Sequence, residues 1–112
     1  MKLVRIDTRR IRAWRTFHDV FSEAFGFPDY YGRNMDAWID CMTYLNDATV
    51  ADTSVQGDAG EVVVLGLDHG EDFCTGCPEL CAAVIECSAF VNWRQIEVGK
   101  ETVLALSFHK QP

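Results

Sequence analysis

Residues 27–42 read Phe-Pro-Asp-Tyr-Tyr-Gly-Arg-Asn-Met-Asp-Ala-Trp-Ile-Asp-Cys-Met and join a tight turn to the start of a helix. Gly32 is expected to let the chain turn into this helix at a backbone geometry that other residues disfavour. Asn34 is a favoured N-cap residue, which predicts a helix over residues 35–45.

The helix expected over residues 35–45 has two unlike faces. Asp36, Asp40 and Tyr44 share one side, each four residues from the next. We call Asp36 and Asp40 the acidic ridge. Asp36 lies in the first turn, where the positive end of the helix dipole favours a carboxylate. The apolar residues gather on the opposite arc, with Cys41 at its edge: Met35, Trp38, Ile39, Met42 and Leu45.

A second helix is predicted before this stretch. Thr16 followed three residues later by Asp19 resembles a capping box, which predicts a helix over residues 17–25. Gly26 suits the position just past the helix end and Pro28 blocks its continuation.

Apolar runs elsewhere predict a parallel sheet. The continuous apolar run of residues 62–65 is typical of a strand covered on both faces. Strands separated by helices favour an α/β fold with a three-stranded parallel β-sheet packed by three to four α-helices. Residues 46–60 are small and polar without a period, so we expect a mobile loop there. The strands are expected near residues 2–6, 61–67 and 102–108, and a further helix, opened by Pro78, near residues 78–92.

The length and charge of the chain indicate a single globular domain with a preference for basic partners. The chain of 112 residues predicts one domain, 1–112, and its 48% of hydrophobic residues fits a globular protein. The net charge is −7, and the stretch from Asn34 to Trp93 has no Lys or Arg. Such a surface repels nucleic acid and favours basic partners. No apolar run is long enough for a membrane span and no secretory signal is visible, so we expect a cytoplasmic protein.

Five cysteines are present, which is an odd number for a disulfide framework. Because thiols in the cytoplasm stay reduced, disulfides are not expected.

The Pro-Asp-Tyr-Tyr-Gly-x-Asn-x-Asp-Ala pattern followed by Asp-Cys resembles the barstar family of intracellular ribonuclease inhibitors. About ten positions match in fixed register, including the rare Tyr-Tyr-Gly, and His18 also stands at the family's place. The resemblance is strong over residues 2–45, whereas over residues 46–112 only the order of elements agrees. It implies a barstar-like fold and an acidic immunity protein of a bacterial cell that binds and catalyses nothing.

The resemblance also implies a binding site for a basic ribonuclease or ribonuclease-type toxin. Two carboxylates on a rigid helix imitate substrate phosphates, and the position of Asp40 is the dominant contact in the family. Tyrosines are large, stiff and amphipathic, which suits the centre of an interface. We expect a monomer without a cofactor, with partner-binding residues Tyr30, Tyr31, Gly32, Asn34, Asp36, Asp40 and Tyr44.

Two departures from the family pattern indicate a related but distinct target. Arg33 stands where an acidic residue is usual, which would place a positive charge within the acidic ridge. Ile39 stands where barstar has a tryptophan, which removes contact area. Both departures argue against strong binding of barnase itself.

Other functions compete with inhibition, among them a protein-interaction module without a ribonuclease target, a zinc protein and an enzyme. His69, Cys74, Cys77 and Cys81 could supply four zinc ligands, although the same spacing suits thiols packed inward at a helix start. An enzyme using the acidic ridge for acid–base chemistry would need a cleft with two unlike environments. The histidines follow no triad order and no phosphate loop or nucleophile elbow is present, so we expect no enzyme.

Overall fold

The computed structural model describes residues 1–110 and contains three strands, four α-helices and a short 3-10 helix. The last two residues of the expected domain 1–112 lie outside the described residues. In chain order the elements are β1 (Lys2–Asp7), η1 (Thr8–Arg10), α1 (Trp14–Phe25), α2 (Met35–Thr43), β2 (Val63–Asp68), α3 (Gly70–Gly76), α4 (Pro78–Glu97) and β3 (Leu104–His109).

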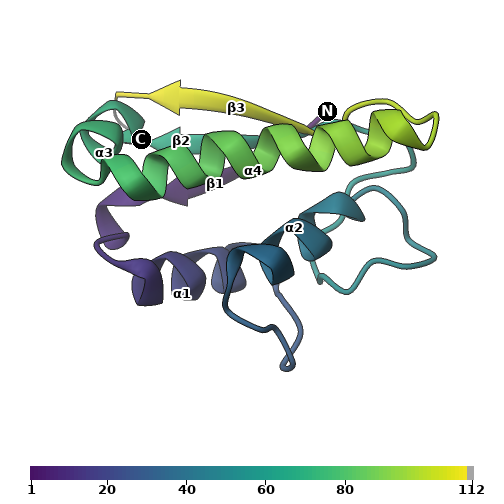
Figure 1. Cartoon of the computed structure of the whole chain (residues 1–112), viewed down its shortest axis with the longest axis horizontal. Helices are drawn as coiled ribbons and strands as arrows, with labels where there is room; N and C mark the ends of the chain where they lie inside the picture. Colours follow the sequence, from purple (N-terminus) through teal and green to yellow (C-terminus); the bar gives the residue numbers. More distant parts are fainter. Residues whose placement is uncertain (111–112) are drawn as a thin grey trace.

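The strands form one parallel sheet in the order β1-β2-β3, which confirms the predicted α/β class. Val4, Leu65 and Leu106 pair across it in register. Parallel neighbours need a helical crossover. α1 and α2 connect β1 to β2, and α3 and α4 connect β2 to β3. α4 runs alongside the strands, with α1 and α2 next to each other on the same side of the molecule (Figure 1).

An aromatic cluster joins α1 to α2. Phe17, Phe21, Phe25 and Trp38 are fully buried. The Phe21 ring lies 5.6 Å from the Trp38 ring in an edge-to-face arrangement and 4.7 Å from Phe17. Such pairs add to the stabilisation from buried apolar area, so this cluster fixes the position of α2.

Five of the six residues of the central strand β2 are buried and Val64 is half-buried, which fits the strand covered on both faces that the apolar run predicts. Leu3, Val64 and Ala105 share the face turned away from the core, and Leu3 is 51% exposed. A side chain at Gly66 would meet Cδ1 of Leu3 at 2.9 Å. Side chains of the neighbouring strands therefore cover β2 on this face.

The predicted first helix, residues 17–25, begins three residues too late. α1 starts at Trp14, and Thr16 is its third residue rather than its cap. Thr16 Oγ1 accepts the backbone N–H groups of Arg12 and Ala13 at 2.8 and 3.0 Å. The helix ends as expected, since Gly26 adopts the left-handed conformation with φ +64°.

The other helix boundaries also differ from prediction. α2 ends at Thr43 instead of residue 45, and α4 continues to Glu97 instead of residue 92. The seven-residue helix α3 was not expected. No single helix among residues 1–110 is long and apolar enough to cross a membrane, and α3 with α4 meets that test only as a pair bent by 117°.

The segment 46–60 has no helix or strand, as predicted, but its backbone is anchored to the ends of α1 and α2. Ser54 N donates to Gly26 O and Gly57 N donates to Leu45 O, at 3.0 and 2.8 Å. Thr53 is buried. These bonds tie the segment to the ends of both helices, and its expected mobility stays a prediction.

Replacing Phe21 with Ala should lower the free energy of unfolding by about 3–5 kcal/mol, because it opens a cavity between α1 and Trp38. Leu3→Ala, on the exposed face of the sheet, should lower it by less than about 1 kcal/mol. Urea denaturation followed by circular dichroism measures both. Equal losses in the two variants would contradict this assignment of the core.

Candidate functional site

The start of α2 is set by a side-chain cap. Asn34 Oδ1 accepts the N–H of Ala37 at 2.8 Å, as predicted for an N-cap. A side chain at Gly32 would lie 3.3 Å from Asn34 Nδ2 and 3.4 Å from the Ala37 Cβ. Gly32 therefore leaves room for the cap. The expectation that Gly32 supplies the unusual backbone geometry is wrong, since Arg33 adopts the left-handed conformation, with φ +54°.

The acidic ridge lies on the outer side of α2. Asp36 is exposed, and the Asp40 side chain is 67% exposed. Tyr44 was expected to continue this exposed side of the helix. It follows the last helical residue instead and is half-buried. Behind the ridge, the Gln95 side chain of α4 donates to the backbone oxygen of Thr43, which fixes the end of α2.

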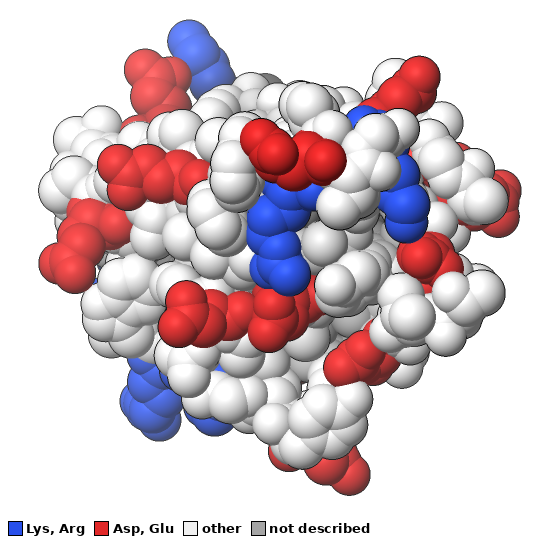
Figure 2. Space-filling model, turned by 45° about the vertical axis from the view of Figure 1, so that its right-hand side comes forward, with Lys and Arg blue, Asp and Glu red and all other residues white. Residues whose placement is uncertain are grey.

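Arg94 of α4 forms an ion pair with the ridge. Its Nη1 lies 3.0 Å from Asp40 Oδ1. Figure 2 shows acidic side chains distributed over this side of the molecule, with basic side chains among them. Sequence reasoning missed this contact because the predicted helix stopped at residue 92. A helix continued by one turn would have included Arg94 and placed it on the same side as Cys87, seven residues and about two turns earlier.

The two tyrosines of the loop have different environments. Tyr30 is 76% exposed, and its hydroxyl donates to Asp52 at 2.6 Å, so segment 46–60 supports it. Tyr31 is half-buried, with its hydroxyl 2.6 Å from Nδ1 of the buried His18. Tyr30 is therefore the tyrosine available to a partner, and Tyr31 fixes the loop on α1.

Burial decides the protonation of the Tyr31–His18 pair. Burial raises the pKa of Tyr31 well above its ordinary value, so the phenol keeps its proton while its oxygen lies at hydrogen-bond distance from His18 Nδ1. Burial, and after it the Arg33 guanidinium, lowers the pKa of His18. The contact between α1 and the loop is thus made by neutral groups at pH 7.

Arg33 does not lie within the acidic ridge, contrary to expectation. Its guanidinium turns back to α1, where it lies 2.7 Å from Asp19 Oδ1 and donates to Arg15 O at 3.0 Å. The left-handed backbone of Arg33 precedes the Asn34 cap. Ile39 is 9% exposed and belongs to the core, so it offers no contact surface.

The thiols of α3 and α4 were expected to be reduced, and this expectation is wrong for two of them. Cys74 and Cys81 form a disulfide, with their Cα atoms 5.0 Å apart. The bend between the two helices brings these residues together, whereas the sequence interpretation treated them as parts of one helix start. Cys41, Cys77 and Cys87 are free.

The proposed zinc ligands are not gathered around one point. Cys74 and Cys81 bond to each other, and Cys77 Sγ lies 3.8 Å from the backbone oxygen of Ile11. His69 caps α3, with its Nε2 buried and without a hydrogen-bond partner. Within the described part of the chain, no three His, Cys, Asp or Glu side chains are placed to hold a metal ion.

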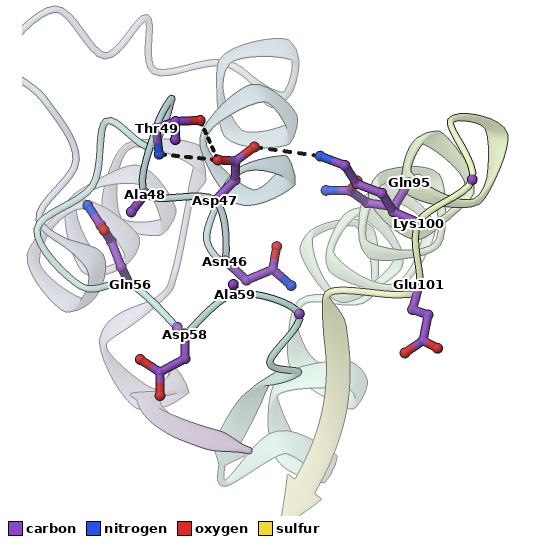
Figure 3. Close-up of a pocket in the computed structure, with 13 residues that line it drawn as sticks. Asn46, Asp47, Ala48, Thr49, Gln56, Asp58, Ala59, Gln95, Lys100 and Glu101 are labelled. Carbon is purple, nitrogen blue, oxygen red and sulfur yellow. Dashed lines mark hydrogen bonds and ion pairs between the residues drawn. The ribbon is translucent and has the colours of Figure 1, made fainter.

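A pocket of about 740 Å³ lies between segment 46–60 and the end of α4. Asp47 and Lys100 form an ion pair of 3.5 Å at its rim, and the carboxylates of Asp58 and Glu101 point to different sides (Figure 3). No cysteine or histidine lines it. The charged groups do not converge on a common point, so the pocket gives no support to catalysis.

Two comparisons relate the chain to known proteins. The sequence model of the family described as “Barstar (barnase inhibitor)” matches residues 1–104. The chain is also similar to “Putative ribonuclease inhibitor YrdF” of Bacillus subtilis (strain 168), with 44% identity over 43 residues. That match covers 38% of this chain and 47% of the relative, so it spans about half of the relative's length. The family match extends far beyond the region of the Tyr-Tyr-Gly motif.

Stability should fall as the solution is acidified below about pH 6.5, the ordinary pKa of histidine. Because the pKa of His18 is lowered in the folded state, the unfolded chain binds a proton first, and unfolding becomes easier until the folded pKa is reached. NMR titration should give a His18 pKa below 6.5, and urea denaturation should show this decrease between pH 7.5 and 5.5. A His18 pKa above 6.5 would contradict the described contact.

The disulfide predicts the number of reactive thiols. Denatured protein without reductant should react with a thiol reagent at three cysteines, and at all five after reduction. Mass spectrometry of the alkylated peptides should find Cys74 and Cys81 joined. Five reactive thiols in freshly purified, unreduced protein would rule out the bond.

Proposed function

The chain belongs to the barstar family of ribonuclease inhibitors, and from this premise we propose that it inhibits a small basic ribonuclease by binding to its active site with the acidic ridge. One observation carries the proposal. Asp36 and Asp40 are exposed on a capped helix whose other side is held by the buried Trp38. Carboxylates with fixed positions suit the Arg, Lys and His groups that hold the phosphates of RNA.

The ion pair between Asp40 and Arg94 is compatible with binding. The Arg94 side chain is 30% exposed and that of Asp40 is 67% exposed. Such exposed pairs contribute at most about 1 kcal/mol. Asp40 can therefore exchange Arg94 for cations of the enzyme at small cost, and its second oxygen has no hydrogen-bond partner among the described residues.

The loop before α2 forms the second part of the proposed site. Tyr30 contacts the enzyme directly, since it is the exposed tyrosine of the pair. Tyr31, Gly32 and Asn34 act through the position of the loop and of the first helical turn. Tyr44 borders the far end of the ridge with its half-buried ring.

The charge of the whole protein favours a basic partner. The stretch from Asn34 to Trp93 carries no Lys or Arg, and the net charge is −7. A field of this sign accelerates the encounter with a positively charged enzyme. In this proposal the protein acts as a cytoplasmic monomer, without a cofactor and without catalysis, and protects the cell that produces the ribonuclease.

Inhibition can be tested with a panel of small basic ribonucleases that includes barnase. Hydrolysis of a fluorogenic RNA should stop for at least one enzyme at an equimolar amount of inhibitor. Activity of every enzyme in the presence of a large excess of folded protein would contradict the proposed function.

Replacing Asp40 with Ala should weaken binding by about 2–5 kcal/mol, mainly through faster dissociation, because the buried cations of the enzyme lose their partner. Part of this range of binding free energies comes from the complex of barnase and barstar itself. Asp36→Ala should cost less, and both variants should unfold at nearly the temperature of the original protein, since exposed carboxylates contribute little to stability. Titration calorimetry measures the affinity. Glu71→Ala is the control, an exposed carboxylate on α3, and should bind normally.

Association should be fast at low salt and slow steeply as the ionic strength rises, because salt screens the attraction between the acidic surface and the enzyme. Stopped-flow mixing at about 10–500 mM salt measures this dependence, over which the Debye length falls severalfold. A rate constant that does not change with salt would exclude electrostatic steering.

A further inference from the structure

α4 has a second apolar surface besides its buried face. Ile85, Phe90, Trp93 and Ile96 are between 45% and 57% exposed. The helix is therefore apolar on its core side and on part of its outer side. Contiguous apolar side chains on a surface often mark a binding site for another protein.

Phe90 lies on the side of α4 that faces the acidic ridge. Residues 87, 90 and 94 follow each other at spacings of three and four, so they share one side of the helix. At one end of this row Arg94 pairs with Asp40 at 3.0 Å. Phe90 therefore lies one helical turn from this ion pair, on the side of α4 that carries Arg94.

Trp93 extends this apolar surface outward. Its ring centroid lies 5.7 Å from that of Phe90, with 30° between the ring planes, and the two rings are 53% and 45% exposed. We call Phe90 and Trp93 the aromatic pair. Two carboxylates flank it on the same helix, Glu86 four residues before Phe90 and Glu97 four residues after Trp93.

We propose that the aromatic pair is the apolar anchor of the ribonuclease interface, and that it receives an apolar patch beside the basic active site of the enzyme. This inference rests on the proposed function and assigns α4 to the same surface as α2. The partner is then an enzyme with two adjoining features, a cluster of cations for the acidic ridge and an uncharged surface for the aromatic pair.

The energetics of interfaces support an anchor at this place. Most binding free energy comes from a few central residues, among which Trp and Tyr are frequent, while charged groups at the rim mainly affect specificity and rate. Ile39 is part of the core and Tyr31 is bonded to His18. Because neither Ile39 nor Tyr31 is available for contact, the aromatic pair provides the apolar contact area of the proposed interface.

Charge favours a basic enzyme over a second copy of the chain. Two copies meeting at the aromatic pair would bring Glu86 and Glu97 of both close together, with a net charge of −7 on each. Like charges at an interface oppose association, whereas a basic rim around an apolar patch is complementary to this surface.

The test compares three exposed side chains of α4 against the enzyme of the panel that is inhibited. Phe90→Ala and Trp93→Ala should each raise the dissociation constant about tenfold or more, through faster dissociation that is nearly independent of salt. Ile85→Ala is the matched control, since Ile85 is 46% exposed and lies about two and a half turns before Arg94, on the opposite side of the helix. It should bind like the original protein.

A spectroscopic measurement follows Trp93 directly. With 5-fluorotryptophan in the inhibitor and unlabelled enzyme, three fluorine signals are expected, and the Trp93→Phe variant identifies one of them. That signal should shift on binding and lose its sensitivity to the solvent isotope, whereas the signal of the buried Trp38 should stay in place.

The outcomes separate this inference from the proposed function. Normal affinity of Phe90→Ala and Trp93→Ala, together with weak binding of Asp40→Ala, would overturn the role of the aromatic pair and leave inhibition by the ridge intact. Concentration-dependent dimerisation that Trp93→Ala abolishes would instead assign the pair to self-association and overturn the proposal. If no enzyme of the panel is inhibited, the proposed function and this inference both fail.

Discussion

The packing of Trp38 against Phe17 and Phe21 is the contact on which the placement of the acidic ridge depends. These rings are fully buried between α1 and α2. Because side chains on opposite sides of a helix point in opposite directions, burying Trp38 turns Asp36 and Asp40 outward. The Asn34 cap then fixes where the helix begins, so one apolar cluster and one cap together determine where both carboxylates lie.

Local patterns predicted the class of fold and the acidic ridge, and long-range contacts account for what they missed. The Asn34 cap and the parallel strands depend on spacings that are visible in the chain itself. The ion pairs of Arg33 with Asp19 and of Arg94 with Asp40 join residues 14 and 54 positions apart, which periodicity does not report. The disulfide was missed because Pro78 was interpreted only as the start of one helix. The short helix α3 before it was not expected, so Cys74 was not placed beside Cys81.

The structure changes the meaning of both departures from the family pattern. Arg33 is bound to α1 and does not oppose a basic enzyme, whereas Arg94, which the motif does not include, lies directly on Asp40. The buried Ile39 removes one contact surface, and the exposed Phe90 and Trp93 offer another on the neighbouring helix. A ribonuclease that fits this surface therefore meets carboxylates on α2 and aromatic rings on α4, which differs from a purely acidic site.

In the proposed complex Asp40 occupies the cationic site of the enzyme where RNA phosphate binds. A double-mutant cycle measures this contact, with Asp40→Ala in the inhibitor and the replacement of an active-site Arg by Ala in the inhibited ribonuclease, and calorimetry of all four pairs. We expect a coupling free energy of about 1.5 kcal/mol or more, the lower end of a range that barnase and barstar themselves established. A coupling free energy near zero, with the two single changes simply additive, would place Asp40 outside the active site and exclude this mode of inhibition.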